Sequence, residues 1–293
     1  MPELPEVETI RRQLAPLVEG MTLAQMEILD PRWSRPLSPE ELTAALVGRR
    51  IESLGRRGKY LLWSFEGDVH LAQHLRMTGV LLYEPEPEPP HTRVRMELEP
   101  PQGGRSRRLV IVDARRFGTA ELLLGSDAVE EFFSARLGLE PFDERFTAEH
   151  LRGLARGRTA PIKALLLDQR KIAGIGNIYA DEALFRARIH PLRQAGKLSR
   201  AQYAALREGI IDALTAGIDA RGATIDDFRH PDGVSGSFQD RFLVHLRGGE
   251  PCGECGGTVV KMVVAGRGTY VCEKCQPRPR TRRTRRSGSP AQV

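Results

Sequence analysis

The 293-residue chain has no apolar run that approaches the length of a membrane span, so the sequence excludes a transmembrane protein. Its first ten residues, MPELPEVETI, are acidic and contain proline, which is not the composition of a targeting peptide. Residues 1–251 contain no cysteine, and nothing indicates an oxidising compartment. We therefore expect a cytoplasmic protein without a membrane partner. Its 40% hydrophobic residues suffice for one large or two ordinary domains.

Cysteine is confined to the end of the chain, as two C-x2-C pairs separated by sixteen residues. The four residues are Cys252, Cys255, Cys272 and Cys275. This spacing is typical of a four-thiolate zinc site, and the residues between the two pairs have the length of a β-hairpin. Two disulfides are the alternative. We predict one structural Zn²⁺, in a hairpin of the kind that often presents side chains to nucleic acid.

Acidic residues are absent from the last eighteen positions, 276–293, where six arginines equal the formal net charge of +6. A second basic stretch, residues 145–193, has ten Lys and Arg against four Asp and Glu. A basic middle and a basic end indicate a surface for a polyanion, with ordinary solvated charge as the alternative. We expect residues 277–293 to form a disordered basic tail.

Short apolar runs separated by turn residues follow an amphipathic helix expected at residues 6–18. These strand-like runs lie at 23–29, 50–54, 60–65, 69–74, 80–83, 94–98 and 109–113. From about residue 126 the pattern becomes helical, with helices expected at 127–137, 147–155, 161–172, 178–189 and 199–220.

These patterns predict an α+β fold in which a mostly β domain, a sandwich or barrel with a leading helix, precedes a helical domain. We place the β domain at residues 1–125 and the helical domain at 126–245. The zinc finger then occupies residues 246–276.

A Gly-x-Gly turn joins two of the expected helices in the segment QRKIAGIGN, residues 169–177. Glycine lets the backbone approach a ligand closely, and the next helix begins there with free N–H groups. Arg170 and Lys171 add positive charge, and Asn177 can cap the helix or donate to a phosphate. We interpret the segment as a clamp for a phosphate backbone. An ordinary helix hairpin that needs glycine for its geometry is the alternative.

The first residues offer a nucleophile. Met1 precedes a small residue, so its removal is expected, and Pro2 then carries a free secondary amine. An α-amino group has a pKa near ~8, against ~10.4 for lysine, so part of it is unprotonated near neutral pH. Attack of this amine on a sugar carbon gives an iminium, and Glu3 beside it is an acid–base candidate. A start without any function is the alternative.

Two basic turns and two strand ends contain further residues that could donate a proton or contact nucleic acid. Lys59 follows Arg-Arg-Gly and can donate a proton or contact a phosphate, although an ordinary surface lysine is the alternative. Arg267 lies between glycines in the zinc hairpin, and its guanidinium can form hydrogen bonds with a phosphate. The motifs HLRM, residues 74–77, and DARRF, residues 113–117, place Met77 and Phe117 at turns, as wedges into a base stack or as core residues.

Together these motifs resemble those of the bacterial formamidopyrimidine-DNA glycosylases, which remove 8-oxoguanine. The resemblance extends from Pro2 to Gln276 and rests on PELPEVET, RRGKYL, HLRMTG, DARRFG, LLLDQRKIAGIGNIYADEALF and VVAGRGTYVCEKCQ, in this order. It implies an N-terminal β-sandwich with flanking helices, a helical domain with a helix–two-turn–helix, and a zinc finger. It also implies damaged double-stranded DNA as the partner of a monomer in the bacterial cytoplasm, associated with the nucleoid when bound to DNA.

The same resemblance implies a bifunctional DNA glycosylase and lyase of base-excision repair, specific for oxidised purines. Pro2 attacks C1′ of the damaged nucleotide and Glu3 assists as a proton donor. Lys59 donates a proton in the β-elimination that follows, and Arg267 does so in the δ-elimination. The residues implied near DNA are His74, His91, Arg115, Arg116, Arg158, Lys163 and Asn177. Met77, Arg115 and Phe117 would fill the space that the flipped base leaves.

The sequence departs from the family pattern at His245-Leu246, where members commonly have Tyr-Gly, and in the arginine-rich tail. We predict that the tail adds salt-dependent affinity for DNA, and that residues 221–227 cover the flipped base. Two alternatives remain open. One is a glycosylase of the endonuclease eight type, which prefers oxidised pyrimidines and tends to begin Pro-Glu-Gly-Pro-Glu. The other is a non-catalytic zinc DNA-binding module, against which the presence of the four catalytic candidates argues.

Overall fold

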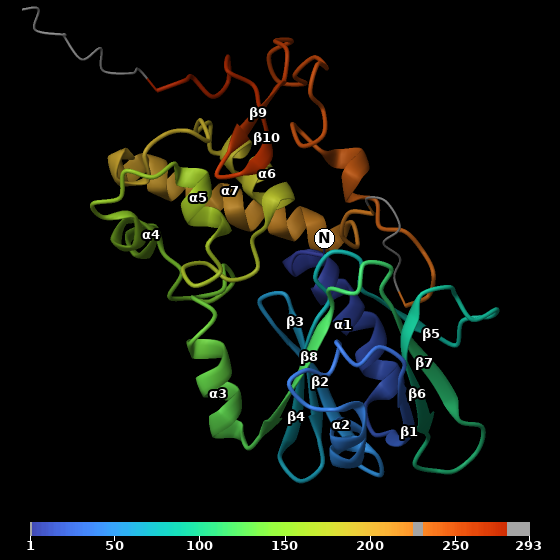
Figure 1. Cartoon of the computed structure of the whole chain (residues 1–293). Helices are drawn as coiled ribbons and strands as arrows, with labels where there is room; N and C mark the ends of the chain where they lie inside the picture. Colours follow the sequence, from blue (N-terminus) through green and yellow to red (C-terminus); the bar gives the residue numbers. More distant parts are fainter. Residues whose placement is uncertain (1, 225–230, 280–293) are drawn as a thin grey trace, which may run out of the picture.

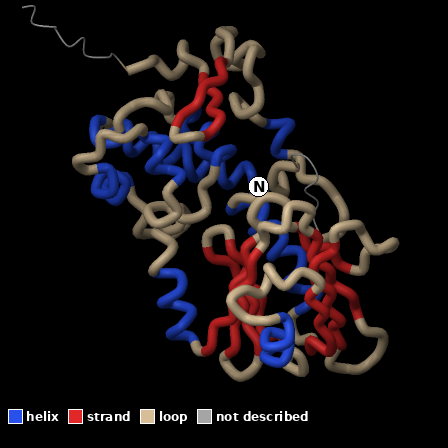
Figure 2. Tube along the Cα trace, in the orientation of Figure 1, coloured by secondary structure: helices blue, strands red, loops and turns tan. Residues whose placement is uncertain are grey.

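The computed structural model describes residues 2–224 and 231–279, and its first half is built from two four-stranded antiparallel sheets beside a long helix (Figures 1 and 2). One sheet has the order β1 (Thr22–Ile28), β6 (Thr92–Glu99), β7 (Arg107–Val112), β5 (Val80–Tyr83). The other has the order β2 (Ile51–Arg57), β3 (Tyr60–Phe65), β4 (Val69–His74), β8 (Thr119–Leu124). The predicted α+β fold with an N-terminal β-sandwich is confirmed.

Helix α1 (Leu4–Val18) supplies one side of the core of this half. Its apolar positions Val7, Ile10 and Leu14 recur at helical spacing and are buried. They pack with inward-facing side chains of both sheets, such as Trp63 of β3 and Met96 of β6. Burial of alternate residues along β6 reflects the period of two that a half-buried strand requires. The helix predicted at residues 6–18 is thus confirmed, and it begins two residues earlier.

Two elements of this half are absent from the sequence prediction. Helix α2 (Pro39–Leu46) begins at a capping box formed by Ser38 and Glu41. Strand β8 pairs with β4 along its whole length and leads directly into α3 (Ser126–Ser134). Both are short, and α2 buries only Leu42 and Leu46, so neither produces a long apolar pattern.

The second half is helical and has its own core. It contains α4 (Ala148–Ala155), α5 (Ile162–Leu167), α6 (Asn177–Arg186), α7 (Arg200–Asp219) and the short 3₁₀ turns η1 (Ala195–Lys197) and η2 (Phe238–Arg241). Leu4, from the start of α1, is completely buried in this second core rather than in the first. The beginning of the chain therefore lies where the two halves meet, as the N label in Figure 1 shows.

The zinc hairpin consists of β9 (Val260–Val264) and β10 (Arg267–Val271), paired antiparallel and joined by Ala265 and Gly266. Both turn residues have positive φ, 52° and 71°, which is the geometry of a two-residue type I′ turn. Arg267 is thus the first residue of β10 rather than part of the turn. β10 lies against α6 (Figure 1). Over the described residues, no helix combines the length and apolar character needed to cross a bilayer.

Candidate active site

The carboxylate of Glu3 occupies the N-terminus of α6. It accepts hydrogen bonds from the backbone N–H groups of Gly176 at 2.7 Å and Ile178 at 2.9 Å, and it is almost fully buried. Such N–H groups and the helix dipole favour an anion at this position. The Gly-x-Gly turn therefore binds a carboxylate of the chain itself, and the expectation that its helix N–H groups are free for a phosphate is wrong. A clamp role for Arg170, Lys171 and Asn177 stays a prediction.

Gly176 has to be glycine because of this contact. A Cβ atom there would lie 2.3 Å from the carboxyl carbon of Glu3, far inside van der Waals contact. Gly174, two residues earlier, has φ +90° and accepts the backbone N–H of Leu4 at 3.0 Å through its carbonyl oxygen. The two glycines thus fasten the start of the chain to the helical half.

Glu6 holds the other side of the N-terminal segment, and the sequence analysis missed it. Its carboxylate accepts the backbone N–H of Glu3 at 2.8 Å, the hydroxyl of Tyr179 at 2.7 Å and the backbone N–H of Ala223 at 2.7 Å. Burial, and then the charge of Glu3, raise the pKa of Glu6. A signal was present, because a side-chain acceptor followed three residues later by Glu before an apolar run is a capping-box pattern.

Lys59 comes from the turn between β2 and β3 and is only 5% exposed. Burial is the main cause that lowers its pKa. The positive charge of Arg267 also lowers it, whereas the carboxylates of Glu3 and Glu6 raise it. These charges act on one another across the space between α1, the β2–β3 turn and β10. The structure thus brings Glu3, Lys59 and Arg267 to one junction, with the buried Pro2 adjacent in the chain.

A cavity of about 500 Å³ opens beside Lys59. Its basic wall consists of Arg76, Arg136 and Arg170. His74 also lines it, and burial, followed by the charges of Arg76 and Lys59, lowers the pKa of His74 to about 3. The neutral imidazole accepts the backbone N–H of Arg76 through Nδ1 at 2.9 Å. The positive lining suits a polyanionic ligand.

The two predicted wedge residues are exposed, Met77 at 37% and Phe117 at 50%, so the alternative of core packing is wrong for both. The guanidinium of Arg115 lies 4.8 Å from the centre of the Phe117 ring. Asp113 ties the two loops together, because its carboxylate accepts the hydroxyl of Thr78 and the backbone N–H of Arg115. The role of Asp113 was not visible in the sequence, since it depends on a contact between distant turns.

The remaining predicted DNA contacts lie in different environments. His91, Arg116 and Arg158 are exposed. Asn177 is half-buried, and its amide nitrogen donates to the carbonyl oxygen of Gly268 at 2.9 Å. The Asn177 Oδ1 atom is buried and has no hydrogen-bond partner among the residues that the structure describes.

Lys163 differs from the other predicted contacts, because its side chain is 0% exposed. Its ammonium donates to Asp181 at 2.6 Å and to the hydroxyl of Thr269 at 2.8 Å. A direct DNA contact does not fit this position. The family resemblance implied Lys163 as a residue near DNA, and the sequence could not show its burial because its partner Asp181 comes eighteen residues later.

The His245-Leu246 departure has a structural consequence at each residue. His245 Nδ1 lies 2.8 Å from the Asp181 carboxylate. Leu246 has φ +60° in the left-handed region, which strains a residue with a side chain, and it is 51% exposed. A glycine, as the family pattern leads us to expect there, would adopt this backbone without strain.

The sulfur atoms of Cys252, Cys255, Cys272 and Cys275 lie within 4.8 Å of one another. Two of the separations are 3.9 and 3.5 Å. Four thiolates about 2.3 Å from a tetrahedral zinc ion would be about 3.8 Å apart, so the four sulfurs fit one Zn²⁺. The predicted structural zinc site is confirmed, and because all four thiols are free, the alternative of two disulfides is wrong.

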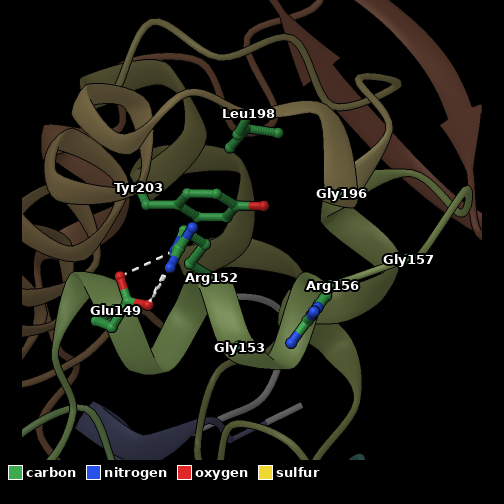
Figure 3. Close-up of a pocket in the computed structure, with 8 residues that line it drawn as sticks. All are labelled: Glu149, Arg152, Gly153, Arg156, Gly157, Gly196, Leu198 and Tyr203. Carbon is green, nitrogen blue, oxygen red and sulfur yellow. Dashed lines mark hydrogen bonds and ion pairs between the residues drawn. The ribbon is translucent and has the colours of Figure 1, made fainter.

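A separate cavity of about 420 Å³ lies between α4, η1 and the start of α7 (Figure 3). It is lined by Arg152, Arg156 and Tyr203 among others, and Arg152 is paired with Glu149 at 2.5 Å. None of the predicted site residues lines it, so it does not belong to the junction described above.

Fold and site define a two-domain protein whose zinc hairpin and N-terminus meet between the domains, and known proteins share this organisation. The family model of the formamidopyrimidine-DNA glycosylase N-terminal domain matches residues 1–120. The models of the H2TH domain of this glycosylase and of a zinc finger found in FPG and IleRS match residues 137–229 and 249–278.

Whole relatives match as well. The formamidopyrimidine-DNA glycosylase of Thermus thermophilus is 48% identical over 283 residues, covering 94% of this chain and 98% of the relative. That of Roseiflexus sp. RS-1 is 44% identical over 279 residues, with 94% and 100% covered. The chain belongs to the formamidopyrimidine-DNA glycosylase family, as its motifs predict.

Solved structures agree with this assignment. The crystal structure of MutM (Fpg) from Thermus thermophilus matches with a TM-score of 0.83 at 45% identity, covering 94% of this chain and 98% of that one. Fpg of Lactococcus lactis, in a complex with DNA that contains an oxidised pyrimidine, matches with a TM-score of 0.86 at 35% identity, covering 94% and 100%.

Proposed function

We propose that the protein excises oxidised purines, such as 8-oxoguanine and formamidopyrimidines, from duplex DNA in base-excision repair and then cleaves the abasic strand. The observation that carries this proposal is the docking of Glu3 on the N-terminus of α6, where Asn177 holds the carbonyl group of Gly268 next to Arg267. The buried Lys59 feels the charges of both Glu3 and Arg267. The glycosylase activity is supported by the family of the relatives, which are formamidopyrimidine-DNA glycosylases. The lyase activity rests on the chemistry of these residues.

The damaged base has to leave the helix before any group can reach its sugar, and extrusion costs a few kcal/mol. Met77 and Phe117 protrude from two loops that Asp113 holds together. Inserted side chains of this kind occupy the space left in a base stack and stabilise the opened helix. Arg115, stacked on Phe117, adds positive charge for the strand opposite.

In the first step, the secondary amine of Pro2, free once Met1 is removed, forms a bond to C1′ as the glycosidic bond breaks. The base leaves with the bonding electrons and takes a proton from water. The Glu3 carboxylate accepts the proton that the Pro2 amine loses, and returns it to the ring oxygen as the sugar ring opens. The result is an iminium between Pro2 and C1′. Because Glu3 is fixed by the N-terminus of α6, its carboxyl group needs no rearrangement to act.

Two eliminations follow from the iminium. Loss of a proton from C2′ breaks the bond from C3′ to its phosphate oxygen, and Lys59 donates a proton to the departing group. Loss of a second proton breaks the bond from C5′ to its oxygen, with Arg267 in the corresponding role. Hydrolysis then frees Pro2 and leaves a one-nucleotide gap. Burial lowers the pKa of Lys59 and so brings it closer to neutral pH. Proton transfer is most efficient when the pKa of the donor lies near the pH at which the enzyme works.

The test is cleavage of paired duplexes that contain either 8-oxoguanine or an oxidised pyrimidine. The proposal requires faster cleavage of the 8-oxoguanine strand, with both ends carrying phosphate, and loss of cleavage in Glu3→Gln. Equal or faster cleavage of the pyrimidine duplex would favour a second candidate, a glycosylase for oxidised pyrimidines. That candidate is kept because the Lactococcus lactis Fpg has been solved with an oxidised pyrimidine in its DNA.

We also propose the division into a catalytic domain at 1–125, a helical domain at 126–245, a zinc finger at 246–276 and a tail at 277–293, most of which lies outside the described residues. The protein would act as a cytoplasmic monomer, associated with the nucleoid when bound to DNA. The covering role predicted for residues 221–227 also falls partly outside the described residues. Light scattering of the protein–DNA complex tests whether one chain binds each duplex. A mass that corresponds to two chains per duplex would contradict the proposed monomer.

A further inference from the structure

Strand β10 is attached to the helical domain through backbone groups that its partner β9 does not use. In an antiparallel pair, alternate residues turn their N–H and C=O groups away from the partner strand. In β10 two such groups find side chains of α6. The carbonyl oxygen of Gly268 accepts Asn177 Nδ2 at 2.9 Å, and the N–H of Tyr270 donates to Asp181 Oδ2 at 3.3 Å.

A buried ion pair extends this attachment toward Arg267. Asp181 Oδ1 accepts Lys163 Nζ at 2.6 Å, and both side chains are 0% exposed. Lys163 Nζ also donates to the hydroxyl of Thr269 at 2.8 Å. That hydroxyl donates in turn to the carbonyl oxygen of Arg267 at 2.9 Å. A continuous series of hydrogen bonds therefore joins the Asp181 carboxylate to the backbone of Arg267.

His245 encloses the carboxylate from the remaining side. Its Nδ1 lies 2.8 Å from Asp181 Oδ2, and its ring packs edge-on against Phe242 and Tyr270. Asp181 thus has partners from α5, from β10 and from the segment that precedes the zinc hairpin. A carboxylate bound on so many sides has a single orientation, and it fixes the orientation of its partners.

We propose that Asp181 is a positioning residue for Arg267, which acts through Lys163 and Thr269 to set where the first residue of β10 stands in the domain junction. This inference rests on the proposed function, because only that function gives Arg267 a part in the second elimination. Arg267 follows a two-residue turn, so its placement depends on how β10 is attached. A displacement of about 1 Å can slow a reaction on the order of a hundredfold.

The experiment uses the full-length, zinc-loaded protein and a duplex with a preformed abasic site, under single-turnover conditions. A gel separates strand ends left by the first elimination from those left by the second. Borohydride trapping in parallel measures the iminium. Asp181→Asn is compared with Glu182→Gln, a matched control. Glu182 is the next residue, equally buried, and its carboxylate accepts the backbone N–H groups of residues 243–245.

We expect Asp181→Asn to lower the ratio of second to first elimination about tenfold or more, with borohydride trapping within about twofold of the unsubstituted protein. Glu182→Gln should leave this ratio unchanged. Thr269→Val removes the hydroxyl but keeps the buried ion pair, so it tests the same connection if Asp181→Asn does not fold. Combined with Arg267→Ala, Asp181→Asn should lower the ratio no further than Arg267→Ala alone.

Two results would overturn the proposal while the proposed function stands. One is an unchanged elimination ratio in both Asp181→Asn and Thr269→Val, with normal trapping. The other is an equal fall in Glu182→Gln, which would show that the ratio follows general stability. If the unsubstituted protein gives no borohydride adduct, the proposed function itself fails, and the assignment of Asp181 fails with it.

Discussion

At the scale of single residues, the main ionisable groups of the junction share one property, which is burial. Glu3, Lys59 and His74 are all nearly inaccessible to water. Sequence motifs identified these residues, because each lies in a short segment shared with the family. The motifs did not reveal Glu6, Asp113 or Asp181, whose partners come from distant parts of the chain.

His74 makes the stability of the protein depend on pH. Its pKa is about 3 in the folded protein and about 6.5 in an unfolded chain. As the pH falls from about 6.5 toward 3, only the unfolded chain takes up this proton, so the free energy of unfolding falls by up to about 1.4 kcal/mol per pH unit. In His74→Gln this contribution disappears.

The check is urea unfolding of both proteins at pH 7.5 and pH 5. The loss of stability between the two pH values should be smaller in His74→Gln, by up to about 2 kcal/mol. Equal losses in the two proteins would contradict the low pKa assigned to this imidazole.

At the scale of elements, apolar periodicity predicted strands and long helices well. β3, β4 and β5 have the bounds expected from the sequence, because their apolar runs end sharply at turn residues. The helix expected at 161–172 instead ends at Leu167, and residues 168–176 form the turns that carry the two glycines. Periodicity could not show this, because Ile172 and Ile175 are buried in the same core as the helices, and burial alone does not distinguish a turn from a helix.

Gly176→Ala tests the docking of Glu3 on α6. The added methyl group would lie 2.3 Å from the carboxyl carbon of Glu3, a steric overlap that forces the N-terminal segment to move. We expect stability to fall by about 1–3 kcal/mol and iminium formation to be largely lost. DNA affinity, measured by fluorescence anisotropy, should change little.

Gly153→Ala is the matched control. Gly153 lies in α4, has ordinary helical φ and meets no atom within 4 Å, so alanine there should stabilise the protein by about 0.4–1 kcal/mol. Normal iminium formation in Gly176→Ala would show that Glu3 does not need its place at the helix N-terminus.

At the scale of the whole molecule, the first turn of the chain and one arginine join the two domains. Leu4 belongs to the helical core, and Arg56 of the β2–β3 hairpin pairs with Glu8 at 3.0 Å and with Glu140 at 2.8 Å. Burial alone would raise the pKa of Glu8, but hydrogen bonds from Arg11, Arg12 and Arg56 outweigh it and lower the pKa to about 2. Sequence reasoning predicted the two domains but not these connections, which depend on the folded arrangement.

The zinc hairpin is too small to fold on its own apolar core, so the metal ligands determine its stability. In Cys255→Ser we expect loss of bound zinc, of DNA binding and of strand cleavage, because Arg267 is no longer held at the junction. Zinc analysis and a binding titration measure this, with exposed Ser134→Ala as a control. Near-normal cleavage by a zinc-free protein would be incompatible with the role of the hairpin.

The arginine-rich tail should contribute affinity that depends on salt and not on sequence. Removing residues 280–293 deletes five arginines, so the slope of log affinity against log salt should fall in magnitude by up to about 4.5. A tail of equal length with these arginines replaced by glutamine is the control, and it should behave like the truncated chain. An unchanged slope would show that the tail does not contact DNA.

The proposed chemistry depends most on the N-terminal amine at the junction of the two domains. The direct measurement is borohydride reduction of the protein on an 8-oxoguanine duplex, followed by peptide mapping of the adduct. We predict a covalent adduct on the peptide that begins with Pro2, and the same adduct in a Lys59→Ala variant. No adduct, or an adduct on a lysine, would contradict the account.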